Sequence, residues 1–400
     1  MVIRAREEGG QGDLTILPWL LLSDSVIVDG TAFVPVTGRT VRRWLPGATG
    51  ATVALILRRY RDARGHRLRG FTVALHRQGD EWTWKTPEDQ GARERVNSDR
   101  QILALACLAE QKFFQSRAHL NGAMFVSPVQ RMTPGEDGIC IVRQRRDGQT
   151  LDGGWSFSDV TFQAPLMIPH DIYPAPSEEF LAALVAARAV GAPVFERIDA
   201  ALPFFILGVS EVPDLISHPS AMLLALAYSR LIDPDDKGAH SLATNFGLLW
   251  SQYTRTTLQQ AGLQPDAGAL QKYAPEQRRN PVHMKWAKEL YETRSSFVHH
   301  GPGNGESRNW TPWQHVIAAS FAFPLTVKLL LAEAGFYRLS DDDKCWCGAL
   351  DRLLVEGFQV TDSRLGPDWP RILAEEGLAS ERRKLRDEIV SLIDTASRRN

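Results

Sequence analysis

Up to about residue 165, short runs of apolar and β-branched residues alternate with turn residues, a pattern typical of strands. Residues 26–28, the pair Asp29-Gly30 and residues 32–36 predict a hairpin. One helix is expected to interrupt the strands, with Ser98 as its cap, Gln101 reaching back, and an apolar series from Ile102 to Ala109. Further strands are expected at 52–60, 71–77, 81–85, 123–126, 139–143 and 155–162.

Beyond residue 177 the apolar residues recur at helical spacing. Before that point, Pro165, Pro169, Pro174 and Pro176 interrupt any regular element and predict a stiff connector. The predicted fold is therefore an α+β N-terminal domain over 1–165, a connector at 166–176 and an all-α domain with a C-terminal helical extension over 177–400. Helices are expected at 177–190, 219–232, 242–261, 281–299, 312–334, 341–355 and 381–396.

The helix expected at 281–299 has clear boundaries. Asn280 is a suitable cap and Pro281 suits the first turn. After it, the glycine-rich stretch 301–305 cannot remain helical, and a capping box from Thr311 to Gln314 opens the next helix. The inward face of the helix is predicted from spacings of three and four residues, and comprises Val282, Trp286, Leu290, Thr293 and Phe297.

Composition narrows the class of protein. A chain of 400 residues with 44% hydrophobic content favours two domains. Its formal charge of -1 argues against a protein that coats nucleic acid by bulk electrostatics, but is compatible with a local basic groove. The four cysteines show neither a zinc pattern nor a disulfide framework, so we expect a reducing cytoplasm and no metal. No signal peptide is expected, and the uncharged stretch 316–327 is shorter than the roughly 20 residues a bilayer requires, which predicts a core helix and no membrane.

The segment 292–301 contains the residues with the most informative chemistry. Arg294 is a permanent, planar cation that can hold a phosphate, and His299 can transfer a proton near neutral pH. On a straight helix Arg294 would lie ~140° from His299 and ~120° from His300 around the axis. We therefore expect the helix to end or tighten near Val298, so that the histidine can turn towards the arginine.

The motif consists of an Arg and a His separated by four residues, followed by His-Gly, at the end of a helix in a helical region. It resembles the motif of the HEPN superfamily, and in particular that of the Apea-like HEPN group of prokaryotic antiviral defence proteins. The resemblance covers about residues 177–334. It implies a metal-independent endoribonuclease without cofactor, active as a homodimer, with Arg294 and His299 as catalytic residues and His300 also within the permitted spacing. The family most often has Asn, Asp or His after the arginine, where this chain has Ser295.

The mechanism that this resemblance implies is attack of a ribose 2′-hydroxyl on its own phosphate, which leaves a cyclic phosphate and a free 5′-hydroxyl. Either His299 and His300 divide the roles of base and acid, or a dimer supplies His299 twice. We expect an antiphage or toxin-like effector whose N-terminal domain senses a phage or cellular trigger. Expected RNA contacts are Ser295, Lys285, Lys288, Arg278 and Arg279.

Other interpretations stay open at this stage. Arg294 could form a surface ion pair, for example with Glu289, and the two histidines could cap the helix C-terminus. The bundle could also be a catalytically silent module that binds a nucleotide or a partner protein. The basic run 58–69 could grip a phosphate backbone or be a solvated hairpin tip. His315, Cys345 and Cys347 are expected to be structural.

Overall fold

The protein is described by a computed structural model that covers residues 3–110, 122–136, 138–144, 150–156, 160–164, 173–210, 217–235, 237–264, 278–300, 309–361 and 366–397. It divides into two compact units. The first comprises the described residues up to 185 together with residue 210, and the second comprises the rest. The expected connector at 166–176 stays a prediction, because residues 165–172 lie outside the described ranges.

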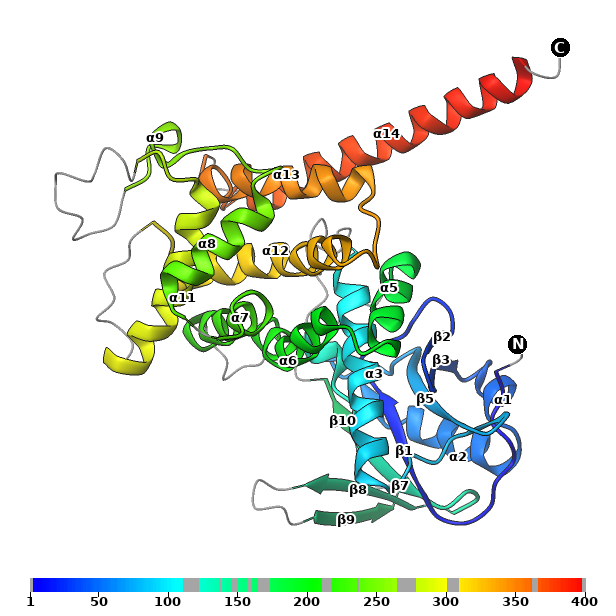
Figure 1. The fold of residues 1–400 in the computed structure, drawn as a ribbon. Coiled ribbons are helices and arrows are strands. Elements are labelled where there is room, and N and C mark those ends of the chain that lie inside the picture. Colours follow the sequence, from blue (N-terminus) through cyan, green and yellow to red (C-terminus); the bar gives the residue numbers. More distant parts are fainter. Residues whose placement is uncertain are drawn as a thin grey trace. The chain divides into compact units, whose positions relative to one another are not determined.

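An antiparallel sheet forms the core of the first unit, in the order β2-β3-β5-β1-β7-β8-β9 with β6 beside β5 (Figure 1). The predicted hairpin is present: Val26 pairs with Phe33, and Asp29 adopts φ 52° in the turn. A separate parallel pair joins β4 (Tyr60–Arg61) to β10 (Phe162–Gln163). The strands of the large sheet are β1 (Gly12–Leu17), β2 (Val26–Val28), β3 (Thr31–Thr37), β5 (Gly70–Gln78), β6 (Glu81–Thr83), β7 (Val129–Met132), β8 (Gly138–Gln144) and β9 (Thr150–Ser156).

Two segments expected to be strands are helical. Residues 52–57 belong to a helix. Val53, Ile56 and Leu57 fall on the same side of that helix, and this side is buried in the core formed with the sheet. Burial of that face overrides the local preference of β-branched residues for strands. Residues 123–125 form a short 3-10 turn. The helical elements of this unit are α1 (Val41–Trp44), α2 (Gly47–Leu57), α3 (Gln90–Leu108), η1 (Gly122–Phe125) and most of α5 (Glu178–Ala189).

Helix α3 begins at Gln90, two turns before the cap predicted at Ser98. The Asp89 carboxylate is the actual cap and accepts a hydrogen bond from the Ala92 N–H at 2.8 Å. Strands β1 and β7 were also not predicted. In β1 polar and apolar residues do alternate from Asp13 to Ile16, and both faces of the strand are covered, because Thr15 is buried as well as Leu14.

The second unit is helical, so the predicted order of a mixed α/β region followed by a mostly helical region is confirmed. Helix α6 was not predicted, the helix expected at 242–261 is interrupted after Trp250, and the helix expected at 381–396 begins earlier, at Trp369. The helices are α6 (Pro193–Gly208), α7 (Ser217–Ile232), α8 (Ala239–Trp250), α9 (Leu258–Ala261), α11 (Val282–His300), α12 (Pro312–Glu333), α13 (Asp341–Val355) and α14 (Trp369–Ser397).

Helix α12 is the central element of this unit and packs against α6, α7 and α13. It is long and apolar enough to cross a membrane by length and composition, but 83% of its most apolar window is buried inside the protein. The core helix predicted at 316–327 is thus confirmed. Its start is also as predicted, with Pro312 in the first turn and the Gln314 side chain accepting the Thr311 N–H at 2.7 Å.

Candidate functional site

Helix α11 carries the predicted motif and lies against α7 and α8 (Figure 1). Its inner face is the one expected: Val282, Trp286 and Leu290 are fully buried. Thr293 is half-buried, and its hydroxyl donates to the Glu289 carbonyl at 2.8 Å. The side chain of Phe297, the last member of the predicted face, lies outside the described residues.

Aromatic contacts fix the rotation of α11. The Trp286 ring lies 5.7 Å from the ring of Tyr228 on α7 and 5.5 Å from that of Phe246 on α8. The Tyr228 hydroxyl in turn donates to the Ala319 carbonyl of α12 at 3.1 Å. Tilted and edge-on rings at these separations attract one another beyond the area they bury. The motif helix is therefore held by three neighbouring helices.

Arg294 is half-buried on the side of α11 that meets α7. Its Nη1 atom lies 3.4 Å from the Ser229 hydroxyl oxygen, and its guanidinium carbon lies 5.1 Å from the centre of the Tyr291 ring. Both contacts favour a positive charge at this position, the first as a long hydrogen bond and the second by cation–π attraction. The guanidinium is thus placed by α7 and by its own helix.

The suggested surface pair between Arg294 and Glu289 is not formed. Glu289 binds Lys285, with Nζ and Oε1 3.1 Å apart, and its other oxygen accepts the Asn309 N–H at 3.0 Å. The Asn309 side-chain amide donates to Glu289 Oε1 at 2.9 Å. Lys285 and Glu289 are almost fully buried, with side chains 4% and 3% exposed. The hydrogen bonds from Asn309 connect the motif helix to the segment that leads into α12, and the burial of Lys285 offers no support for its expected RNA contact.

Helix α11 continues through His300, so the early end expected near Val298 is not observed. His299 follows Arg294 by five residues on a regular helix, which separates their positions by ~140° around the axis and ~7.5 Å along it. The backbone by itself therefore does not bring the two residues together. The side chains of His299 and His300, and residues 301–308 with the predicted glycine-rich exit, lie outside the described residues.

The remaining residues of the predicted site differ in exposure. Arg278 and Arg279 are exposed directly before α11, and Ser295 is half-buried beside Arg294. Lys288 is also half-buried and lies 3.8 Å from Glu292. Arg278, Arg279 and Lys288 are therefore still accessible to a polyanion.

A buried polar cluster that the sequence did not predict lies where α11 begins. His283 Nδ1 is 3.8 Å from Asp351 Oδ1 of α13, and His283 Nε2 is 3.3 Å from the Thr254 hydroxyl. Asp351 Oδ2 accepts the backbone N–H groups of Arg255 and Thr256 at 2.8 and 2.7 Å. Burial by itself would raise the pKa of Asp351, but these hydrogen bonds and His283 outweigh it, so the pKa lies below its usual value.

Of the residues expected to be structural, His315 and Cys347 are buried and Cys345 is half-buried. Both ring nitrogens of His315 lack a hydrogen-bond partner among the described residues, and burial lowers its pKa to about 3. Cys345 and Cys347 are free thiols, and burial raises the pKa of Cys347. Among the described residues, no group of three or more His, Cys, Asp or Glu side chains is placed to hold a metal ion.

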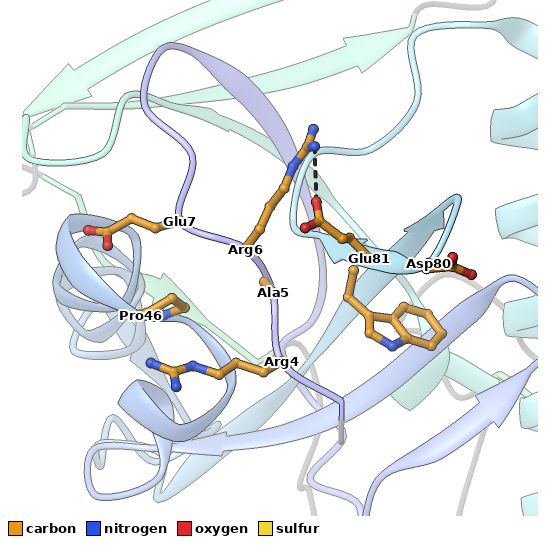
Figure 2. A pocket seen from close by; sticks show the side chains of 8 residues that line it. Arg4, Ala5, Arg6, Glu7, Pro46, Asp80 and Glu81 are labelled. Atoms are coloured by element: carbon orange, nitrogen blue, oxygen red, sulfur yellow. Dashed lines mark hydrogen bonds and ion pairs between the residues drawn. The ribbon is translucent and has the colours of Figure 1, made fainter. Parts of the chain in front are cut away.

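The first unit has an open pocket of about 430 Å³ between its N-terminal segment and the turn before β6. Figure 2 shows Arg4 and Glu7 on either side of Pro46, and Arg6 turned towards Glu81, with which it pairs at 3.3 Å. Asp80 lies at the rim of the same pocket. Charges of both signs share this pocket, which therefore selects no single class of ligand.

Comparisons with known protein families, with curated proteins and with solved structures found no match. The arrangement on α11 offers a cation held between two helices, with two histidines at the end of the same helix. Such a set can bind a phosphate and move a proton, which is the chemistry of phosphodiester cleavage.

Proposed function

We propose that this protein is a metal-independent endoribonuclease of the HEPN class, in which α11 supplies the active site. The observation that supports this most is the setting of Arg294, held between the Tyr291 ring and the Ser229 hydroxyl. A cation that is already in place stabilises charge on a phosphate without reorganisation during the reaction. His299 follows on the same helix, whose C-terminus favours a protonated histidine.

In the proposed reaction, His299 takes the proton of a ribose 2′-hydroxyl, and the 2′-oxygen bonds to the adjacent phosphorus. The bond from phosphorus to the 5′-oxygen breaks, and that oxygen takes a proton from an acid. The products are a 2′,3′-cyclic phosphate and a 5′-hydroxyl. Arg294 balances the negative charge on the phosphoryl oxygens, and each positioned proton-transfer group contributes ~10²- to 10⁴-fold.

One histidine cannot act as base and acid in the same step. Because Arg294 and His299 are far apart around α11, we propose that a homodimer places the two motifs together, with His300 as the acid if a single chain is sufficient. Ser295, Lys288, Arg278 and Arg279 would guide the RNA. The α+β unit would sense a phage or cellular trigger, which makes the protein an antiphage or toxin-like effector in the cytoplasm.

The test uses the purified full-length chain and a labelled RNA in the presence of EDTA. Wild type is expected to produce cyclic phosphate and 5′-hydroxyl ends, whereas Arg294→Ala and His299→Ala produce none. His240→Ala, which removes an exposed histidine of α8, is the matched control and should cleave normally. Equal cleavage by wild type and both motif variants would refute the proposal. Retained activity in His300→Ala would assign the acid to the partner chain.

A catalytically silent module that binds a nucleotide or a partner protein is the second candidate. The uninterrupted helix through His300 favours it, because Arg294 and His299 then present different faces. Ser295, in place of the family's usual Asn, Asp or His, favours it as well. Calorimetry with ATP distinguishes the candidates: nucleotide binding that Arg294→Ala abolishes, together with no RNA cleavage by wild type, supports the silent module.

A further inference from the structure

The loop between α2 and β5 carries the densest positive charge in the chain. We call residues 58–69 the basic loop. It contains six arginines and one aspartate, which give a formal charge of +5 with His66 neutral, whereas the whole chain has -1. Its arginines are Arg58, Arg59, Arg61, Arg64, Arg67 and Arg69.

Backbone hydrogen bonds give the basic loop a defined shape. The Asp62 N–H donates to the His66 carbonyl at 2.8 Å, and the Gly65 N–H donates to the Asp62 carbonyl at 3.0 Å. Arg61 and Arg67 face each other as an antiparallel bridge. Gly65 has φ +85°, a left-handed conformation that suits glycine at the tip. The loop is thus a small hairpin, as one of the two sequence interpretations expected.

The only acid of the basic loop organises the turn from inside. Asp62 Oδ1 accepts the N–H groups of Arg64 and His66, each at 2.8 Å, and the Asp62 side chain is only 2% exposed. Burial would raise the pKa of this carboxyl, but hydrogen bonds from the His66 backbone, the His66 ring and the Arg64 backbone lower it to about 2. The turn is therefore held in place while the carboxylate stays below the surface.

The outer face of the basic loop is almost purely cationic. Arg58, Arg64 and Arg67 are exposed, and none of them forms an ion pair with a residue that the structure describes. The large apolar side chain of the loop points inward: Tyr60 is 2% exposed and stacks on Phe162 at 4.8 Å. Gln163 anchors the loop from β10, through a 2.7 Å hydrogen bond to the Ala63 carbonyl.

We propose that the basic loop binds the phosphate backbone of a nucleic acid strand, without reading its bases. Guanidinium groups bind phosphate through paired N–H donors, and a loop of six arginines without a lysine suits that geometry. Such binding is independent of sequence because the phosphates are the same whichever bases they join, and the tyrosine of the loop, Tyr60, is buried away from any base. A lipid surface is disfavoured, since membrane-binding segments combine basic residues with exposed apolar anchors, and Tyr60 is buried.

This inference does not depend on the nuclease activity proposed for α11. It is tested with the full-length chain and a fluorescent 2′-O-methyl RNA of about 20 nucleotides, longer than a typical single-strand site. Such a strand has no free 2′-hydroxyl, so binding is measured without cleavage. Affinities of wild type, of the triple variant Arg58→Gln/Arg64→Gln/Arg67→Gln and of a control are measured by fluorescence anisotropy at several salt concentrations.

The control is Arg39→Gln/Arg42→Gln/Arg95→Gln, which removes three exposed arginines from the same unit. Wild type should bind more weakly as salt rises. The loop variant should bind about 10- to 100-fold more weakly at ~100 mM salt and lose up to ~2 from the slope of log affinity against log salt, because each phosphate contact contributes ~0.7. The control should keep the wild-type slope.

Three results would overturn the proposal. The first is no binding by wild type at ~100 mM salt, since sequence-independent phosphate contacts still give a Kd of roughly 10⁻⁴–10⁻⁶ M at physiological salt. The second is an equal loss in both triple variants, since that would reflect net charge alone. The third is a preference for vesicles of phosphatidylcholine with phosphatidylserine over the RNA, which would assign the loop to a membrane. Binding of the 2′-O-methyl RNA through the loop, together with no cleavage of an unmodified RNA of the same sequence, would reject only the nuclease.

Discussion

Lys285 and Glu289 form an ion pair one turn apart on α11, with Nζ and Oε1 separated by 3.1 Å and both side chains almost fully buried. Two charges in such a place must balance each other, since neither is solvated by water. Glu289 also receives both N–H groups of Asn309, the residue with which the described chain resumes before α12. Glu289 therefore links α11, which carries the candidate site, to the segment that leads into α12.

We expect Glu289→Gln to lower the free energy of unfolding by ~3–5 kcal/mol, because it removes the negative charge that lies 3.1 Å from the buried Lys285 ammonium. Urea unfolding followed by circular dichroism measures the change. Lys344→Gln is the control, since it breaks the exposed pair with Asp341 and should leave the midpoint unchanged. Equal midpoints for wild type and Glu289→Gln would show that the buried pair is energetically neutral.

Two buried histidines predict that acid destabilises the fold. Burial lowers the pKa of His76 to about 4 and that of His315 to about 3. An unfolded histidine titrates near pKa ~6.5, so below that pH the unfolded chain binds protons that the folded chain does not. Stability is therefore complete above pH ~6.5 and falls as the pH is lowered towards these values, by on the order of 3 kcal/mol per histidine.

Melting temperatures measured from pH 7 to pH 4.5 check this expectation. His315→Met removes one of the two titrating groups and should reduce the fall, because methionine fills the space without a charge. The exposed His240 provides the comparison, and His240→Gln should follow the wild-type curve. A curve for His315→Met parallel to that of wild type would contradict the assignment.

Arg294→Lys should reduce RNA cleavage about 100-fold or more while leaving the melting temperature nearly unchanged. A lysine keeps the charge, but it lacks the planar fork that binds two phosphate oxygens at once. Arg230→Lys makes the same exchange at an exposed position of α7, next to Ser229, and should cleave like wild type. If Arg294→Lys retained full activity, a simple positive charge would be sufficient at this position.

Asp351→Ala should loosen the segment between α8 and α9. It removes the acceptor of the Arg255 and Thr256 N–H groups and takes the carboxylate away from the buried His283 ring. We expect faster hydrogen exchange at residues 251–257 and a loss of ~2 kcal/mol or more. Asp351→Asn, which keeps one acceptor oxygen, should lose less, and Asp235→Ala at an exposed position should lose nothing. Unchanged exchange in Asp351→Ala would show that the segment is held by other contacts.

Asp351 also makes the folded protein less stable in acid, as the two buried histidines do, but for a different reason: its folded state favours the charged form, whereas theirs favours the neutral form. Its pKa lies below the usual value in the folded protein, so its contribution to stability is present above the pKa of the unfolded carboxyl, ~3.9. That contribution is lost as the pH falls through the lower, folded value. Below pH ~4 the Asp351→Ala variant should therefore approach the stability of wild type.

Elements defined by local chemistry could be predicted from the sequence. Helix α13 has the predicted bounds, because Ser340 and Asp343 cap each other's N–H groups at 3.0 Å. The hairpin of β2 and β3 depends in the same way on its turn residues Asp29 and Gly30. In each case the interactions that decide the boundary join residues a few positions apart.

Long-range contacts decided the elements that were not predicted. The apolar run beyond residue 242 was expected to continue as one helix to residue 261, but the helix ends at Trp250, and Asp351 of α13 accepts the Arg255 and Thr256 N–H groups in the segment that follows. Residues 52–57 turned out helical because the sheet covers one of their faces. A window of local sequence contains neither the acceptor nor the sheet.

In the candidate site, too, some features follow from local sequence and others from long-range contacts. The sequence by itself determined that α11 exists, which of its faces is buried, and that Arg294 and two histidines belong to its last turns. Only the tertiary structure decided that Ser229, 65 residues before Arg294, lies beside its guanidinium, and that Lys285 is buried against Glu289. The physical reason is that helical periodicity is a property of neighbours along the chain, whereas the partner of a charged group is chosen by whichever distant segment packs against it.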